Sequence, residues 1–334
     1  SDIEEVSRVY KISKDFITNY SSNVSPYGVP EVVIKELQDN ISVISTYPDR
    51  NYTELREAIS RYTGCDADCV KVGNGATELI SKAIEYIAPK KTIVLQPCYS
   101  EYIRTIKNNG GTSVSFYLQE NRNFEIDIDR LYLSLQDDID MLILCNPNNP
   151  TGQLIDQKLS EQIAIRCTKT GTCLLMDECF HDFLEDGMAH TLLPLVAENP
   201  KIFLLKAFTK MYGMAGLRLG YGICSDVELI RKMEQVSQPW NVSVPAQAAG
   251  IAAVKETEFV KKSRKLMAEQ KAVLLEGLTA AGLKVYGSAA NYIFFRAEPG
   301  FETAMRQMGF MIRNCGNYDG LREEFFRIAV RGEA

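Results

Sequence analysis

The sequence is poor in histidine, with His181 and His190 the only two in 334 residues. A Ser-His-Asp hydrolase, or a metal site built from several histidines, is therefore disfavoured. The nine cysteines contain no Cys-x-x-Cys pair, and several lie inside apolar runs, where free cysteine behaves as a small core residue. We therefore expect a reducing, cytoplasmic setting and no metal site.

The chain also lacks a long apolar run and an excess of basic residues. No run approaches the roughly 20 apolar residues that a membrane-spanning helix needs, so we expect no membrane partner. Lysine and arginine number 37 against 43 aspartate and glutamate, which gives a net charge of −6. Because nucleic acid attracts a basic surface, we do not expect it as a partner. A hydrophobic fraction of 46% indicates a globular chain, long enough for two domains.

From residue 70 onward, short apolar runs alternate with helical patterns. Strands are predicted at 70–72, 92–96, 113–117, 141–145, 173–176 and 202–205. Uninterrupted apolar runs such as 141–145 are typical of parallel strands covered on both faces. The alternation predicts a three-layer α/β domain with a mostly parallel sheet.

The pattern changes after Trp240. A helix from Val244, a charged helix over 258–281 and four strands are expected there, at 283–286, 291–296, 310–313 and 325–330. We divide the chain into an arm (1–40) that packs with the small domain, a large domain (41–240) and a smaller α+β domain (241–334). The first residues already read as a helix, so we expect the chain to start inside a longer polypeptide.

Polar residues follow several of the predicted strands: the turn 73–78, Tyr99, Asn149, Asp177 and Lys210. The carboxyl ends of parallel strands meet at one edge of a sheet, and ligands bind there. The turn is either an anion site at a helix start or a purely structural turn. Asp177 and its neighbour either cap a helix or need a buried partner.

Lys210 lies in a loop with glycines at 213, 216 and 220, and Arg218 follows eight residues later. The glycines predict close approach of backbone to a bound group or to other backbone. A lysine behind a strand is commonly a solvated surface charge. A nucleophilic lysine requires a desolvated or cationic setting, and Arg218 could supply the positive neighbour.

The motifs occur in a definite order: Tyr47-Pro48, Gly73–Glu78, Asn146–Gly152, Asp177–Phe180 and Thr209–Tyr221. The set resembles the pyridoxal-phosphate (PLP) enzymes of the aspartate aminotransferase fold, the class I/II aminotransferase family, over nearly the whole chain. The resemblance implies PLP fold type I and pyridoxal 5'-phosphate as cofactor. Within the family, the chain is similar to the branch of threonine-phosphate decarboxylases and histidinol-phosphate aminotransferases.

The resemblance implies a role for each residue around the cofactor ring. Lys210 would bond to the cofactor and later move protons. Asp177 would pair with the ring nitrogen, Asn149 with the phenolic oxygen, and Tyr99 would stack on the ring.

It also implies the residues that hold anions. The cofactor phosphate would be held by Gly75, Ala76, Thr77, Thr209 and Arg218, and by Tyr47 of a second subunit, which requires a homodimer. The substrate would be bound by Arg327 at its carboxylate, by Arg313 at a second acidic group, and by Asn23 and Tyr27. For the two arginines, surface salt bridges are the alternative.

Two residues depart from the family pattern. Phe180 stands where the family commonly has tyrosine, and Ala207 where serine or threonine often helps to bind the phosphate. Phe180, together with 23–28, 238–240 and 312–321, is more similar to the threonine-phosphate decarboxylases of cobalamin biosynthesis.

We therefore expect a PLP-dependent lyase that decarboxylates a small phosphorylated amino acid such as L-threonine O-3-phosphate. The bond at the substrate's Cα that breaks is the one perpendicular to the ring. Since the sequence leaves this orientation open, a histidinol-phosphate-type aminotransferase is the alternative. A decarboxylase or transaminase of a phosphonate amino acid, and a non-catalytic domain of a longer polypeptide, are further alternatives.

Overall fold

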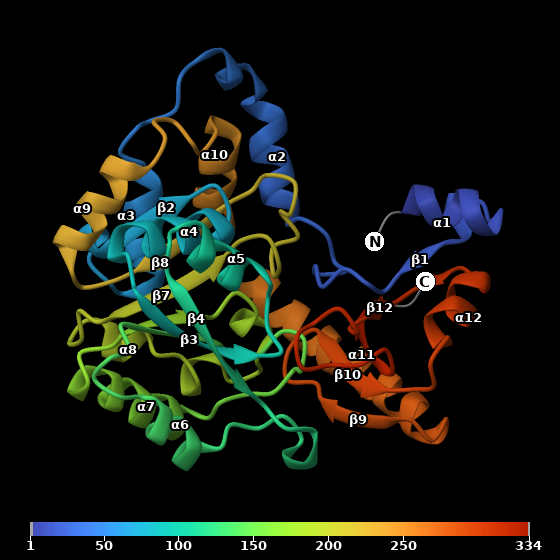
Figure 1. The fold of residues 1–334 in the computed structure, drawn as a ribbon. Helices are drawn as coiled ribbons and strands as arrows, with labels where there is room; N and C mark the ends of the chain where they lie inside the picture. Colours follow the sequence, from blue (N-terminus) through green and yellow to red (C-terminus); the bar gives the residue numbers. More distant parts are fainter. Residues whose placement is uncertain (1–2, 333–334) are drawn as a thin grey trace.

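The computed structural model describes residues 3–332 and contains a large seven-stranded sheet (Figure 1). The strand order is β2-β8-β7-β6-β5-β3-β4. The bounds are β2 (Val70–Gly73), β3 (Lys91–Gln96), β4 (Thr112–Tyr117), β5 (Met141–Cys145), β6 (Cys173–Asp177), β7 (Ile202–Ala207) and β8 (Gly220–Ile223). β8 runs antiparallel to β2 and β7, and the other neighbours pair in parallel. The mostly parallel sheet is confirmed.

Helices cover both faces of this sheet, because its strands send apolar side chains to both sides. In β5, Met141 and Ile143 pack with one layer, while Leu142 and Leu144 pack with the other. The first layer holds α4 (Ala76–Ile87), α5 (Glu101–Asn108) and α9 (Val227–Val236); the second holds α3 (Thr53–Thr63), α6 (Ile128–Ser134), α7 (Gln157–Lys169), α8 (Leu193–Val196) and α10 (Val244–Ala253). The predicted three-layer arrangement is therefore present.

A smaller antiparallel sheet forms the C-terminal domain, in the order β12-β13-β10-β9. Its elements are α11 (Thr257–Ala280), β9 (Lys284–Gly287), β10 (Tyr292–Arg296), α12 (Phe301–Gln307), β12 (Arg313–Asn314) and β13 (Phe325–Ala329). The single strand predicted over 310–313 is wrong. The segment divides into β11 (Phe310–Met311) and β12, because β11 pairs with β1 (Thr18–Asn19) and β12 pairs with β13.

The N-terminal residues connect the two domains. α1 (Ile3–Tyr10) packs on the small domain through Val6, which lies with Ile17 and Met311. α2 (Glu31–Asp39) packs instead against α10. The domain bounds at 40 and 240 stay predictions. Short 3-10 helices lie at Lys14–Phe16, Ile41–Ser45, Ala67–Cys69, Glu120–Arg122, His181–Phe183 and Gly187–Ala189.

Within residues 3–332, no helix combines the length and the apolar character that crossing a membrane requires.

The arm lies directly on the loop that carries Lys210. The backbone N–H of Ser25 donates to the carbonyl oxygen of Lys210 at 2.9 Å. Gly213 has φ +64°, and a Cβ there would lie 2.5 Å from the carbonyl oxygen of Gly28. The close approach predicted for the loop glycines is present at 213, and at 220 against the start of α4, whereas a Cβ at Gly216 would meet nothing within 4 Å.

We predict that Gly213→Ala destabilises the protein, because alanine is strained at this φ and its methyl group collides with backbone. A loss of about 1–3 kcal/mol is expected, measured as a lower urea midpoint. Gly277→Ala in α11 is the control: a Cβ there meets nothing within 4 Å, and alanine favours helix. An unchanged midpoint for Gly213→Ala would contradict this account.

Candidate active site

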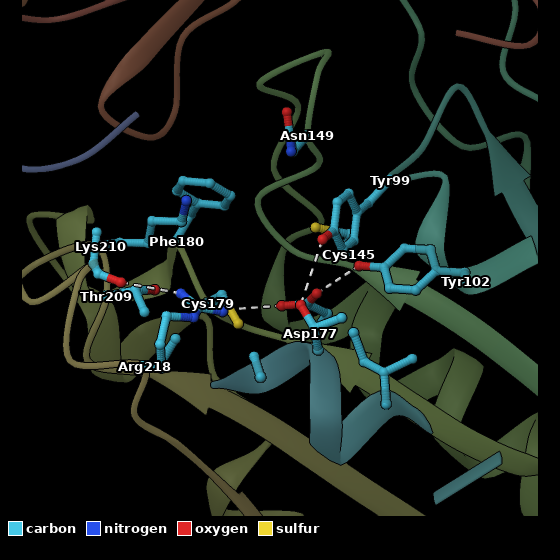
Figure 2. Close-up of a pocket in the computed structure, with 15 residues that line it drawn as sticks. Tyr99, Tyr102, Cys145, Asn149, Asp177, Cys179, Phe180, Thr209, Lys210 and Arg218 are labelled. Carbon is cyan, nitrogen blue, oxygen red and sulfur yellow. Dashed lines mark hydrogen bonds between the residues drawn. The ribbon is translucent and has the colours of Figure 1, made fainter. Parts of the chain in front are cut away.

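A pocket of about 220 Å³ opens at the carboxyl ends of β5, β6 and β7 (Figure 2). It brings together eight predicted site residues: Ala76, Thr77, Tyr99, Asn149, Asp177, Thr209, Lys210 and Arg218. The remaining wall consists of Ile80, Tyr102, Cys145, Cys179, Phe180, Ala207 and Ala215. Tyr99 and Tyr102 lie to one side of Asp177 in Figure 2, and Thr209, Lys210 and Arg218 lie to the other.

Asp177 is the last residue of β6, and both of its carboxyl oxygens accept hydrogen bonds. Oδ2 accepts the Tyr102 hydroxyl at 2.5 Å, and Oδ1 accepts the Cys179 N–H at 2.9 Å. Burial and the nearby Asp177 charge raise the pKa of Tyr102 well above its usual value, so its hydroxyl remains a donor. The helix-capping alternative is wrong, since the next helix, at His181, has no side-chain cap.

Tyr102 is a site residue that the sequence did not reveal. It lies in the first turn of α5, three positions after Tyr99, and its backbone N–H donates to the carbonyl oxygen of Tyr99 at 3.3 Å. That spacing was the available signal. Their rings meet edge to face at 5.7 Å.

Lys210 lines the pocket and is not a solvated surface charge. Burial lowers its pKa, and the charges of Arg327 and Arg218 act in the same direction, while Asp177 opposes them. The amine therefore loses its proton more readily than a free lysine does, which is the condition for a nucleophile. Its Nζ lies 5.2 Å from the centre of the Phe180 ring.

The start of α4 and Arg218 form a cradle for an anion. Gly75 precedes the helix with φ +79°, and a Cβ there would lie 2.6 Å from Nη2 of Arg218. The first turn of α4 has no side-chain cap, and Ala76 and Thr77 line the pocket. Free N–H groups at a helix start beside a guanidinium suit a phosphate. The anion-site interpretation of the turn is therefore favoured over a purely structural one.

Arg327 of β13 does not line the pocket, but it reaches Asn149 of the pocket wall from the small domain. Its Nη1 donates to Oδ1 of Asn149, and its Nη2 donates to the carbonyl oxygen of Ser21 at 3.1 Å. Its Nε is buried and has no hydrogen-bond partner among residues 3–332. The surface salt-bridge alternative is wrong for this arginine, which is buried and forms no ion pair within the part of the chain that the structure describes.

The remaining predicted residues lie outside the pocket. Asn23 is buried, and neither its Oδ1 nor its Nδ2 has a partner within the described range. Tyr27 packs against the main core. Tyr47 is 80% exposed and packs on Trp240 at 4.7 Å. Arg313 lies in a neighbouring cavity, where its Nη2 donates to Asn317 at 2.9 Å.

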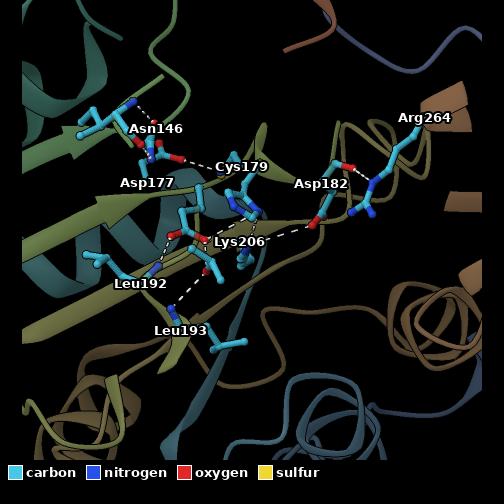
Figure 3. Close-up of polar contacts among 12 residues, drawn as sticks. Asn146, Asp177, Cys179, Asp182, Leu192, Leu193, Lys206 and Arg264 are labelled. Carbon is cyan, nitrogen blue, oxygen red and sulfur yellow. Dashed lines mark hydrogen bonds and ion pairs between the residues drawn. The ribbon is translucent and has the colours of Figure 1, made fainter. Parts of the chain in front are cut away.

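A second polar cluster lies behind the pocket (Figure 3). Glu178, fully buried, forms an ion pair with Lys206 of β7 at 2.8 Å, and it accepts the Thr191 hydroxyl at 2.7 Å. Burial opposes the charge of Lys206, but the carboxylates of Glu178 and Asp182 outweigh this effect and raise its pKa. Burial lowers the pKa of His181 to about 2, so its neutral Nδ1 can accept from Lys206 at 3.2 Å.

Pyridoxal phosphate combines an aldehyde, a ring nitrogen, a phenolic oxygen and a phosphate. The pocket offers a group for each of these: an amine of lowered pKa, a buried carboxyl group, an amide and an anion cradle. A PLP-dependent enzyme of fold type I is the class of protein that this sheet and this pocket define. Residues 16–334 match the family described as aminotransferase class I and II. The chain belongs to this family, whose cofactor is pyridoxal 5'-phosphate.

Relatives of the chain carry the names of two kinds of enzyme. The chain is 33% identical to "Threonine-phosphate decarboxylase" of Salmonella typhimurium, an alignment that covers 100% of this chain and 92% of the relative. It is 31% identical to "Histidinol-phosphate aminotransferase" of Methanococcoides burtonii, over 98% and 89% of the two chains. The crystal structure of the histidinol-phosphate aminotransferase from Clostridium acetobutylicum superposes with a TM-score of 0.88 at 29% identity, covering 95% of each chain.

We predict that the Glu178–Lys206 pair is coupled. Lys206→Met leaves a buried carboxylate without its partner and should cost about 3–5 kcal/mol. The double variant Glu178→Gln/Lys206→Met removes both charges, and glutamine keeps an oxygen for Thr191. It should therefore be more stable than Lys206→Met alone. Urea unfolding of the four proteins of this cycle measures the coupling; additive losses would show that the pair is not coupled.

Proposed function

We propose that the protein decarboxylates a small phosphorylated amino acid of the L-threonine O-3-phosphate type. The observation that carries the proposal is a pair of arginines beside the cofactor pocket. Arg327 presents a buried Nε without a partner in the described structure, and Arg313 lies in the adjoining cavity. They suit a substrate with two anionic groups, a carboxylate and a phosphate. The decarboxylase relative at 33% identity supports this substrate class.

Bound pyridoxal phosphate supplies an electron sink for the bond that breaks at the substrate's Cα. We propose that Asp177, fixed by Tyr102 and by the Cys179 N–H, keeps the ring nitrogen protonated. Tyr99 covers one ring face. Asn149, whose Oδ1 already accepts from Arg327, turns its Nδ2 donor to the phenolic oxygen.

The phosphate of the cofactor is assigned to the cradle at the start of α4. Ala76 and Thr77 bring backbone N–H groups, Gly75 lets the chain turn beside Arg218 while its own N–H donates to Gly73, and Arg218 brings the countercharge. Thr209 adds the hydroxyl that Ala207 lacks. Phe180 likewise has no hydroxyl, and it packs edge to face on Tyr292 at 5.1 Å. We therefore assign the phenolic oxygen to Asn149 alone.

Arg327 holds the substrate carboxylate through its free Nε, and Asn23 and Tyr27 lie in the arm that closes over this side. Lys210 would carry the proton: its neutral Nζ would take one from the substrate's ammonium group and return one to the substrate's Cα after carbon dioxide leaves. The bond that breaks is the one perpendicular to the ring. A difference of about 1.4 kcal/mol in activation free energy between two substrate orientations changes the rate tenfold. A histidinol-phosphate-type transamination needs a different orientation on the same residues, and the aminotransferase relative at 31% identity makes it the second candidate.

We further propose a homodimer in which Tyr47 reaches the cofactor phosphate of the neighbouring subunit. Tyr47 is 80% exposed, and its segment also exposes Ile41 (57%) and Ile44 (64%). Apolar side chains gathered on a surface favour a protein partner. The nine cysteines are all free, which supports the expected cytoplasmic setting.

We predict that the holoenzyme releases carbon dioxide from O-phospho-L-threonine. Carbon dioxide and the amine product are measured, with 2-oxoglutarate and histidinol phosphate as the parallel transamination assay and a phosphonate analogue as a third substrate. Lys210→Ala should abolish both the release and the absorption band of the lysine-bound cofactor. Glutamate formation from histidinol phosphate without any gas would favour the aminotransferase. The absence of a cofactor band in the unaltered protein would favour the non-catalytic domain.

We predict that Tyr47→Phe weakens cofactor binding by about ten- to a hundredfold, since a hydrogen bond to a charged acceptor is lost. Titration with pyridoxal phosphate measures this change, and Tyr10→Phe on α1 is the control. Dilution into the monomer range should release cofactor, because binding to the assembled state stabilises that state. A monomer in sedimentation that still holds its cofactor tightly would overturn the shared site.

A further inference from the structure

A second cavity, of about 480 Å³, adjoins the cofactor pocket. Tyr99 belongs to the walls of both, so the two spaces meet at this ring. The large domain contributes the loop before α5 and one face of α5. The small domain contributes the segment that runs from Arg313 to Asp319. We call this space the basic cavity.

Three cations line the basic cavity: Arg104, Lys107 and Arg313. The carboxylate that lines it, Asp319, accepts the Tyr117 hydroxyl at 3.0 Å. Arg104 forms an ion pair with Glu101. Within residues 3–332, neither Lys107 nor Arg313 forms an ion pair. A cavity with this excess of positive charge contrasts with a net charge of −6 for the chain, and it will attract an anion.

The cations of the basic cavity come from both domains and face one another across it. Arg104 and Lys107 lie three residues apart on α5, so their charges project from the same exposed face of the helix, and Glu101 pairs with Arg104 alone. Across the cavity, Arg313 is fixed by its bond to Asn317 at 2.9 Å and by stacking on Tyr318 at 5.4 Å. These contacts pre-orient its guanidinium, and an anion between the two domains would neutralise the excess positive charge.

We propose that the basic cavity binds the phosphate of the substrate, and that Arg104 and Lys107 of α5 determine specificity for phosphorylated amino acids. The inference rests on the proposed function. A substrate held beside Tyr99 extends its phosphate into the cavity. There the guanidinium of Arg313 can donate two parallel hydrogen bonds, and the ammonium of Lys107 adds a positive charge. An amino acid without the phosphate leaves Lys107 and Arg313 without an ionic partner.

The double variant Arg104→Gln/Lys107→Gln tests the proposal in the holoenzyme. We expect KM for O-phospho-L-threonine to rise about ten- to a hundredfold, because two charged contacts are lost, with kcat nearly unchanged. The cofactor absorption band and the binding of unphosphorylated L-threonine should not change. An unchanged KM overturns the proposal.

Lys262→Gln/Lys265→Gln on α11 is the matched control. It removes the same charge at the same spacing from exposed positions that do not line the basic cavity. It should leave KM unchanged, whereas a rise equal to that of the α5 variant would show a general charge effect and overturn the assignment.

A binding measurement separates this proposal from the proposed function. If the unaltered enzyme turns over no O-phospho-L-threonine, the proposed function fails, and the cavity is then tested with inorganic phosphate alone. Line broadening in ³¹P NMR should be greater with the unaltered holoenzyme than with the α5 variant. Equal broadening by the two proteins overturns the cavity assignment as well.

Discussion

Two adjacent carboxyl groups, buried where β6 ends, constrain the whole site. Successive residues of a strand point to opposite faces. Asp177 therefore follows Leu175 toward the layer of α4 and α5, while Glu178 follows Met176 toward the other layer. Each needs a partner, because an unpaired buried charge is costly. Asp177 obtains Tyr102 and a backbone N–H, and Glu178 obtains Lys206 and Thr191.

Because Asp177 and Glu178 have different kinds of partner, the two faces of the sheet differ in charge balance at this point. On the Glu178 side the charges are neutralised within the protein, which ties β6 to β7 immediately before the loop of Lys210. On the Asp177 side the carboxyl group accepts from neutral donors. Its negative charge therefore remains available to a cationic ring nitrogen. The ion pair behind the pocket thus holds together the ends of β6 and β7, whose other face lines the pocket.

The sequence was sufficient for the sheet and for much of the pocket, because both rest on local patterns. Uninterrupted apolar runs identified β5, β6 and β7, and the polar residues that follow these strands converge on one edge. Contacts between residues that are distant in the chain could not be predicted from the sequence, because tertiary packing determines them. The spacing from Tyr99 was the one local signal for Tyr102, and its bond to Asp177 joins residues 75 positions apart. Lys206 lies in a strand that otherwise looks wholly apolar, and its partner is 28 residues away in sequence.

The strand predicted at 310–313 is divided in two because its halves pair with different strands, which is also a tertiary effect. One of these pairings involves the arm. β11 pairs with β1 of the arm, so the N-terminal segment continues the surface of the small domain. The arm then passes over the pocket, where Ser21 accepts from Arg327 and Ser25 donates to the backbone of Lys210. Two residues of the arm, Ser21 and Ser25, therefore link Arg327 of one domain to the backbone of Lys210 in the other. Neither domain alone fixes the distance between these two residues, so the arm is as much part of the site as the strands that supply its side chains.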